Sequence, residues 1–477
     1  MYKWAVFFIC LCVTACGHTG REHAQIIELV RQGNLTAAQQ LAEKEDFYAD
    51  TPSLLARYFE TGTLHYLKGE YYQALQNFDK ARALSEKLYT KSISKSAAAQ
   101  IAGDGLAPYA GEKYELSLLR FYQSLTHYKL YEQGYYESYT VQEDDAPRVI
   151  ERKDLSESEK RLHFNAARAS ILDWNSLLTT FTNESTDKDD FRQDMLAKTW
   201  GAEIHDIYGT SGDRQIARQL YKDAQKLLDS VYADYPSYRE KHGERLKQYA
   251  ADKGKDLYAP ADKKENVKIV LKTGLITPKV AEKVDIRIPF AAFLFSGNKD
   301  NFVSCLSNIL PGQRISFEIP TVPEPAKVGD YQVLILGKDG KKIASKQMVL
   351  TAPVSETAYR EYKNKRSALI AEKSARLTTK YAAAVVSACA LYDPNDAFKL
   401  LAAYAAFAAS TKLIKASEYA DVRYWGLLPD AVFQQSLALK KGSYNGEIRS
   451  NGKKIKTFSF TVRNSRPVLV DLNIPNR

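Results

Sequence analysis

Three stretches in the N-terminal half share one pattern, and this repeat constrains the fold more than any other feature of the chain. The stretches are QGNLTAAQQLAEK (32–44), KGEYYQALQNFDKARAL (68–84) and SGDRQIARQLYKDAQKLL (211–228). Each places an alanine five positions after a glycine, and the first two copies lie 36 residues apart. A glycine suits the turn between antiparallel helices, and small residues let those helices approach closely. The pattern therefore predicts stacked pairs of helices.

The spacing of the first two copies is close to the period of roughly 34 residues that defines tetratricopeptide (TPR) repeats. The sequence predicts a TPR-like helical array over residues 16–251, with a degenerate copy at 126–138 and a polar insertion at 137–160. The expected packing framework consists of Gly69, Ala74, Phe78, Ala81, Gly212, Ala217, Tyr221 and Ala224. Such arrays present a concave face that binds proteins, but similar helices also serve as plain scaffolding. The repeat alone favours neither role.

The pattern changes at 252–266, a charged stretch with one proline that we interpret as a linker. After it, apolar and polar residues alternate in two blocks, 267–353 and 430–475, which predicts β-strands. Each block has too few strands to be stable alone. We therefore expect one antiparallel, β-sandwich-like domain over 267–477 that carries an alanine-rich helical insertion at 355–417. The fold class predicted for the whole chain is α+β.

The insertion contains two apolar segments rich in small residues, 381–392 and 398–410, separated by DPND. Each is shorter than the roughly 20 apolar residues that cross a bilayer. We expect them to form a buried pair of closely packed helices. Contact with a membrane surface, or between copies of the chain, is the alternative that the composition leaves open.

The N-terminus has the layout of an export signal. A positive charge precedes an apolar run at 4–13, which is too short for a membrane span. The residues VTAC at 13–16 resemble the bacterial lipobox, which implies removal of residues 1–15 and attachment of lipid, including palmitate, to Cys16. The next residue is Gly17 rather than aspartate, which implies delivery to the outer membrane. An ordinary signal peptide cut nearby is the alternative.

Two cysteines lie outside this N-terminal segment, Cys305 and Cys389. An oxidising periplasm permits a disulfide between them, but a pair so distant in sequence cannot be assigned without a structure. The simpler expectation is two separate, small, buried side chains.

The formal net charge of +10 favours anionic surroundings, such as lipid headgroups or cell-wall polymers. Nucleic acid would attract the same charge. However, the lysines are spread along the chain, and no basic aromatic block or nucleic-acid motif occurs. No nucleic-acid partner is expected.

The stretch ASEYADVRYWGLLPD (416–430) resembles the signature Thr-Glu-x-Ala-Asp-x-Arg-x-Trp-x-x-Leu-Pro of a little-characterised family of bacterial outer-membrane lipoproteins. Residues 105–130 and 270–289 are similar to two further motifs of that family, and Ser417 departs from it where threonine is usual. The resemblance implies a lipid-anchored protein that faces the periplasm and has no settled biochemical activity.

The signature offers Glu418, Asp421, Arg423, Trp425 and Pro429 as candidate site residues. At helical spacing, Glu418 and Asp421 would share one face. We expect these residues to form a structural junction. In it, Arg423 pairs with one of the two acids, Trp425 fills the seam between helix and sandwich, and Pro429 ends the helix. A protein-binding epitope is the second interpretation.

Catalysis is not expected. A hydrolase needs an activated nucleophile or a poised base with its partners, whereas the sequence has no GxSxG, HExxH or CxxC motif and all seven histidines precede residue 250. No cofactor or metal is predicted. We expect a scaffold or adaptor that binds an envelope protein through the helical array and the membrane through lipid on Cys16. A structural part of a secretion or motility machine, and less so a peptidoglycan or glycan hydrolase, are the alternatives.

Overall fold

The computed structural model describes residues 20–44, 46–93, 107–141, 147–184, 191–239, 241–260, 263–287, 299–309, 314–463 and 467–476. The predicted signal peptide and Cys16 lie outside the described residues.

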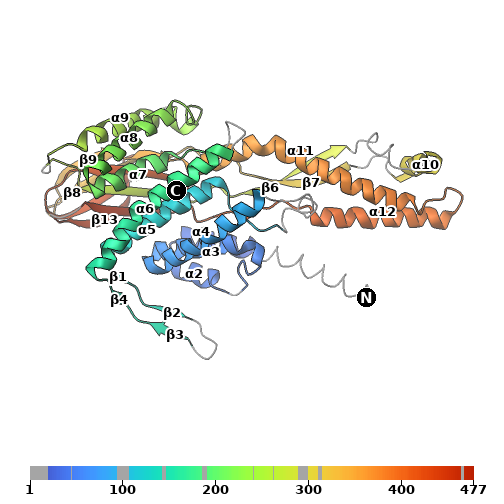
Figure 1. The fold of residues 1–477 in the computed structure, drawn as a ribbon, viewed down its shortest axis with the longest axis horizontal. Helices are drawn as coiled ribbons and strands as arrows, with labels where there is room; N and C mark the ends of the chain where they lie inside the picture. Colours follow the sequence, from blue (N-terminus) through green and yellow to red (C-terminus); the bar gives the residue numbers. More distant parts are fainter. Residues whose placement is uncertain are drawn as a thin grey trace.

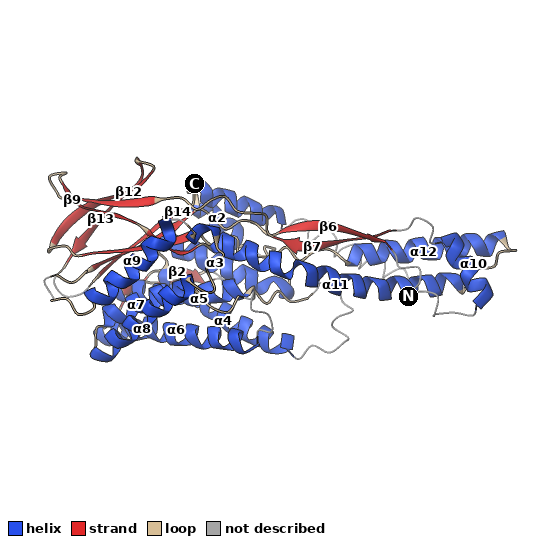
Figure 2. Cartoon of the chain, turned by 90° about the horizontal axis from the view of Figure 1, so that it is seen from above, coloured by secondary structure: helices blue, strands red, loops and turns tan. Residues whose placement is uncertain are grey.

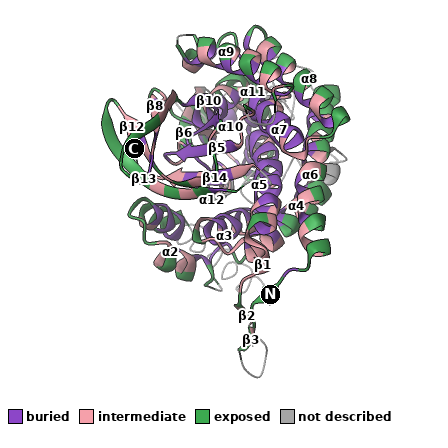
Figure 3. Ribbon diagram, turned by 90° about the vertical axis from the view of Figure 1, so that its left-hand side faces the viewer, coloured by how far each residue is buried: buried purple, intermediate pink, exposed green. Residues whose placement is uncertain are grey.

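The N-terminal half is helical. A helix over residues 20–31 is followed by α2 (Leu35–Ala42), α3 (Leu54–Lys68), α4 (Tyr71–Ile93), α5 (Lys113–Gln133), α6 (Glu157–Glu184), α7 (Met195–Tyr208), α8 (Ser211–Leu228) and α9 (Lys241–Asp256). Helices that follow one another in sequence pack together, most extensively α3 with α4, α5 with α6 and α7 with α8. Figure 3 shows them as an arc, from α2 to α9, that curves around a central sheet.

The side chains expected to pack between these helices are buried. Ala74, Phe78, Ala81, Ala217, Tyr221 and Ala224 each expose at most 1 % of their surface. Gly69 ends α3 in the left-handed conformation, with φ +81°, and makes the turn before α4. Gly212 does not make a turn: it lies in the first turn of α8, and Gly209 (φ +77°) ends α7 instead. The role predicted for Gly212 is therefore wrong, because Thr210 already caps α8 ahead of it.

The polar insertion predicted at 137–160 contains a β-ribbon. β1 (Tyr135–Tyr136) pairs with β4 (Lys153–Asp154), and β2 (Tyr139–Val141) pairs with β3 (Arg148–Ile150). The ribbon projects from the helical array (Figure 1).

The described part of the C-terminal half contains two four-stranded sheets and a separate two-stranded ribbon. The first sheet has the order β10-β11-β5-β14 and consists of β5 (Val267–Thr273), β10 (Val349–Ala352), β11 (Ala431–Leu437) and β14 (Val468–Ile474). The second has the order β13-β12-β8-β9 and consists of β8 (Tyr331–Leu336), β9 (Lys342–Gln347), β12 (Gly442–Ser450) and β13 (Lys453–Val462). The ribbon pairs β6 (Val280–Arg287) with β7 (Arg314–Thr321). β14 pairs with β5 in parallel, so the first sheet is mixed rather than antiparallel as predicted.

Strands from both predicted blocks occur in each four-stranded sheet. β5 of the first block lies between β11 and β14 of the second, and β8 of the first bonds to β12 of the second. Every residue of β5 is buried, because the strand is covered on both faces. Ile269 and Leu271 pack in one apolar cluster with the second sheet, whereas Val270 packs with the helical array. Lys268 and Lys272 share the face of Val270, since side chains alternate along a strand.

The described residues of the charged stretch, 252–260 and 263–266, belong in part to a helix and form ion pairs with the rest of the molecule, so the linker prediction is wrong. α9 continues to Asp256. Lys253 lies 3.3 Å from the carboxylate of Glu265, and Lys264 lies 2.7 Å from that of Asp206 in α7. Lys253 and Lys264 thus pair with carboxylates of α7, whereas Asp252 and Lys255 of the same stretch remain exposed.

A helical hairpin extends from one end of the molecule. α11 (Val354–Cys389) leads away from the sheets and α12 (Ala397–Ser417) returns along it, with α10 (Lys299–Ile309) packed on α11. Figures 1 and 2 show these helices and the β6–β7 ribbon at one end of an elongated molecule. They enclose a small apolar cluster of their own, which includes Leu306, Phe317 and Val385.

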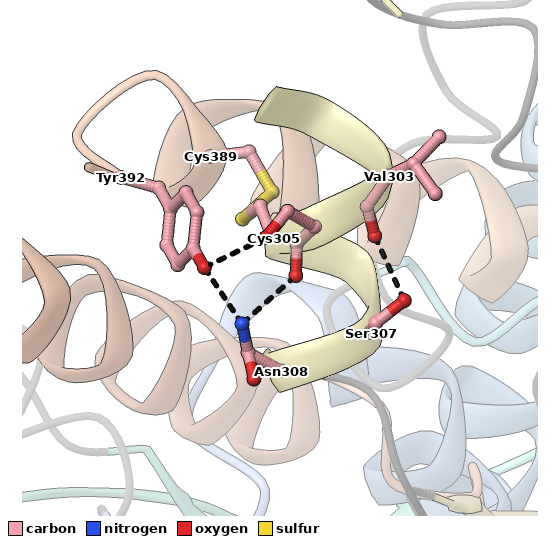
Figure 4. Close-up of a disulfide and its surroundings, with 7 residues drawn as sticks. Val303, Cys305, Ser307, Asn308, Cys389 and Tyr392 are labelled. Atoms are coloured by element: carbon pink, nitrogen blue, oxygen red, sulfur yellow. Dashed lines mark hydrogen bonds between the residues drawn. A yellow bond between two sulfur atoms is a disulfide. The ribbon is translucent and has the colours of Figure 1, made fainter. Parts of the chain in front are cut away.

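A disulfide joins Cys305 of α10 to Cys389 at the end of α11 (Figure 4). Beside it, the amide nitrogen of Asn308 donates a hydrogen bond to the hydroxyl of Tyr392, with the atoms 2.6 Å apart. The expectation of two separate side chains is therefore wrong. The two cysteines meet only because α10 packs on the hairpin, which the local sequence around either cysteine does not indicate.

Candidate functional site

The signature segment 418–430 is not helical. α12 ends at Ser417, and no helix covers the residues from Glu418 to Trp425. Glu418 and Asp421 therefore do not share a helix face, and Pro429 does not end a helix; both predictions are wrong. Pro429 instead lies two residues before β11, and the backbone N–H of the intervening Asp430 donates to the carbonyl of Thr273 in β5.

The two acids of the signature have different partners. Glu418 is bound by two cations of α11, with Arg376 at 2.9 Å and Lys380 at 2.6 Å. Asp421 receives both Nε and Nη2 of Arg423, at 2.8 and 2.7 Å. The acids thus sit at two separate points, one against the hairpin and one within the segment.

Arg423 also links the segment to the loops that precede α3 and α5. Its guanidinium donates to the carbonyls of Pro52, at 2.9 Å, and Ala107, at 2.7 Å, and to the hydroxyl of Ser53, at 3.2 Å. A planar group with five donors suits this role, because it can satisfy several acceptors at once.

Trp425 is fully buried in the helical array. Its ring stacks on Phe59 with the centroids 4.3 Å apart and also contacts Phe78 and Tyr122. Its Nε1 donates to the hydroxyl of Thr63 at 2.8 Å. The indole therefore fills a pocket made by α3, α4 and α5.

Two buried carboxylates hold the backbone of this segment. Glu60 of α3 accepts hydrogen bonds from the backbone N–H groups of Gly426 and Leu427, at 2.5 and 3.2 Å, and lies 2.8 Å from Nε2 of His23. Glu115 of α5 accepts from the N–H of Trp425 at 2.7 Å. The array thus binds the backbone of a segment of its own chain through the side chains of Glu60 and Glu115.

Glu60 and Glu115 were missed by the sequence analysis. A carboxylate directly beside large apolar residues, as Glu60 is beside Phe59 and Glu115 beside Leu116, is the signal that could have found them, because a buried charge requires donors. Burial, together with the negative charge of Glu112, raises the pKa of the Glu115 carboxyl to about 7.

A second buried polar cluster joins the array to the central sheet. The amine of Lys268 in β5 lies 2.7 Å from both Glu203 and Asp206 of α7, and Lys253 of α9 lies 3.2 Å from Glu203. All four side chains expose at most 2 % of their surface. Burial alone would raise the pKa of Glu203, but the charges of Lys253 and Lys268 outweigh it and hold the pKa well below its usual range. Each charge is used in an internal ion pair, so the cluster is structural.

A hollow lies on helices α5, α6 and α7. It is lined by Tyr131, Glu157, Ser158, Lys160, Arg161, Leu162, Phe164, Asn165 and Tyr208. Phe164 stacks on Tyr208 with the centroids 4.8 Å apart, and Tyr131 lies 4.9 Å from Phe164. Leu162 at its edge is 65 % exposed. Tyrosine and arginine around an apolar centre are the residues that dominate protein-binding surfaces.

α12 is largely exposed, so the prediction of a buried helix pair is wrong. Of its described side chains, only Ala403 and Phe407 are buried. Phe398 is 80 % exposed and Leu401 68 %. Among the described residues, the segment Ala397–Lys415 is the one helical stretch long and apolar enough to cross a membrane, judged by length and composition.

The residues that the structure describes contain no group of three His, Cys, Asp or Glu side chains placed to hold a metal ion. Comparisons with family models, curated proteins and solved structures find no match to this chain. The functional argument therefore rests on the geometry described above.

Proposed function

We propose that the protein is a lipid-anchored scaffold or adaptor of the bacterial outer membrane that faces the periplasm and binds an envelope protein without catalysis. The disulfide between Cys305 and Cys389 supports an oxidising compartment, because such bonds are rare in the cytosol. The lipobox-like residues before Cys16 support the anchor.

In this proposal the helical array is TPR-like, and the two four-stranded sheets form a sandwich-like support. The array's inner side is already in contact with its own chain, since Trp425 and the backbone of Gly426 are bound there. A partner therefore binds elsewhere on the array. We assign the partner-binding site to the hollow of Tyr131, Phe164 and Tyr208. This surface combines rigid aromatic side chains with the exposed Leu162.

A crosslinking pull-down from solubilised envelopes tests the hollow. Leu162→Glu places a charge at its edge and should abolish capture of the partner. Leu172→Glu is the matched control, because Leu172 lies on the same helix, is 58 % exposed and does not line the hollow. Both variants should melt as the wild type does, since neither side chain is buried. Equal capture by the two variants would exclude the hollow as the binding site.

The anchor is tested separately. Cys16→Ser should move the protein out of the membrane fraction or leave its signal segment uncleaved. Normal processing and unchanged membrane fractionation of this variant would show that Cys16 carries no lipid.

A further inference from the structure

The exposed side of α12 is apolar, although a helix on the surface of a globular protein normally faces solvent with polar residues. The residues with their side chains on this side are Phe398, Leu401, Tyr404, Ala405, Ala408, Ala409, Lys412 and Leu413, and all of them are exposed. The opposite side also carries apolar groups, Ala403 and Phe407, which pack in the cluster of the hairpin. A helix that is apolar on all sides is typical of surroundings other than water.

The charged residues of α12 are all positive. The helix contains Lys399, Lys412 and Lys415 and no aspartate or glutamate. Lys412 and Lys415 are exposed near its C-terminal end. Long lysine side chains can lay their methylene groups along an apolar surface and keep the amine in the polar headgroup layer.

We propose that α12 lies in the surface of an anionic phospholipid bilayer, with Phe398, Leu401 and Leu413 among the acyl chains and Lys412 and Lys415 at the phosphate groups. Helices that lie in a membrane surface are held there by buried apolar area and by attraction of their cations to anionic lipids. A second copy of the chain is a poorer occupant. Two α12 helices brought face to face would place lysines against lysines with no acid on either helix.

The hairpin is braced so that it presents this side without rearrangement. The disulfide from Cys305 to Cys389 holds α10 to the distal end of α11. Glu418, which follows α12 directly, is held to α11 by Arg376 and Lys380. The C-terminal end of α12 is therefore fixed against α11, and the disulfide fixes α10 on that same helix.

The position of the N-terminal helix agrees with a nearby membrane, an argument that rests on the anchor proposed above. His23 packs against Tyr424, with ring centroids 5.1 Å apart, and Tyr424 lies seven residues after the C-terminal end of α12. Cys16 lies four positions before Gly20, where the described helix begins, and four positions span at most about 14 Å. A lipidated Cys16 would hold the bilayer close to the base of the hairpin.

Vesicle flotation tests the proposal with the chain from Gly17 onward, which contains every described residue and has no lipidation site. The protein should float with vesicles of phosphatidylcholine and phosphatidylglycerol and much less with phosphatidylcholine alone. Phe398→Ser/Leu401→Ser should lower the partition coefficient by at least about ten-fold, because two large apolar side chains leave the bilayer. Lys412→Glu/Lys415→Glu should lower it by a similar factor on the anionic vesicles only. Leu172→Ser, an exposed leucine of α6, should have no effect.

A tryptophan placed by Phe398→Trp should be quenched by brominated lipids, which reports contact with the acyl chains. If the protein floats with neither type of vesicle, the proposal is overturned. So would a lipid-free dimer in sedimentation that Phe398→Ser/Leu401→Ser converts to a monomer, because a second copy would then cover α12. Neither result bears on Cys16 or on the hollow, so failure here is separable from failure of the proposed function.

Discussion

The rings of Trp425 and Phe59 lie parallel to within 6°, with their centroids 4.3 Å apart, although one belongs to the C-terminal half and the other to the third helix of the array. This contact joins the two halves of the molecule through an apolar group, and the hydrogen bond from Nε1 to Thr63 fixes its orientation.

Trp425→Ala should therefore destabilise the whole protein. Truncation of a fully buried tryptophan leaves a cavity and typically lowers the free energy of unfolding by about 3–5 kcal/mol. Trp425→Phe keeps the stack but loses the bond to Thr63, so it should cost less. Urea unfolding of both variants measures the difference. A wild-type midpoint for Trp425→Ala would mean that the contact contributes nothing to the junction.

Glu115 should make stability depend on pH. Its folded-state pKa of about 7 lies above the ordinary 4.5, so the folded protein holds this proton more tightly than the unfolded chain does. The contribution of this group is most favourable below pH 4.5 and is lost as the pH rises toward 7. With 1.36 kcal/mol for each pKa unit, the loss is about 3 kcal/mol.

Urea unfolding of wild type and Glu115→Gln at a series of pH values isolates this group. The stability of the wild type relative to the variant should fall between pH 4.5 and 7. Glu28→Gln, on the exposed surface, is the control and should follow the wild type at every pH. Parallel curves for wild type and Glu115→Gln would show that Glu115 titrates normally.

Lys268→Met should destabilise the contact between α7 and the central sheet. The substitution leaves Glu203 and Asp206 buried with one cation fewer, and removal of one partner from a buried ion pair typically costs about 3–5 kcal/mol. Lys222→Met, at an exposed position of α8, is the matched control. Thermal unfolding compares the two, and equal melting temperatures would contradict a structural role for the cluster.

The disulfide should stabilise the hairpin rather than the whole protein, because the cluster around it is separate from the two larger ones. Cys305→Ala/Cys389→Ala should cost about 2–4 kcal/mol in local stability. Limited proteolysis should then cut near α10 at lower protease concentration, and reduction of the wild type should reproduce the effect. Unchanged cleavage in both cases would mean that packing alone holds α10.

Local sequence patterns predicted the features that depend only on neighbouring residues, such as which side chains pack between adjacent helices. Ala74 and Phe78 were predicted to pack between helices because helical spacing and residue size suffice to place them, and both are buried. Gly212 was misplaced because a helix start depends on its capping residue, here Thr210, and not on the glycine alone.

Contacts between distant parts of the chain could not be predicted in this way. Nothing near Trp425 indicates that Phe59 is its neighbour, and nothing near β5 indicates that β11 and β14 flank it. The small apolar residues of α12 predict burial within the protein, whereas most of its described side chains are exposed. Composition shows that such a helix avoids water, but it does not show whether protein or lipid replaces the water.

The insertion of Trp425 between α3, α4 and α5 has a consequence for how the protein is made. Synthesis from the N-terminus delivers Phe59, Phe78 and Tyr122 long before the residue that covers them. During that interval three aromatic side chains and the carboxylate of Glu60 have no native partner from the segment around Trp425. Folding of the array around Trp425 must therefore wait until nearly the entire chain has been synthesised, which makes the C-terminal segment a late and obligatory step in the folding of the N-terminal half.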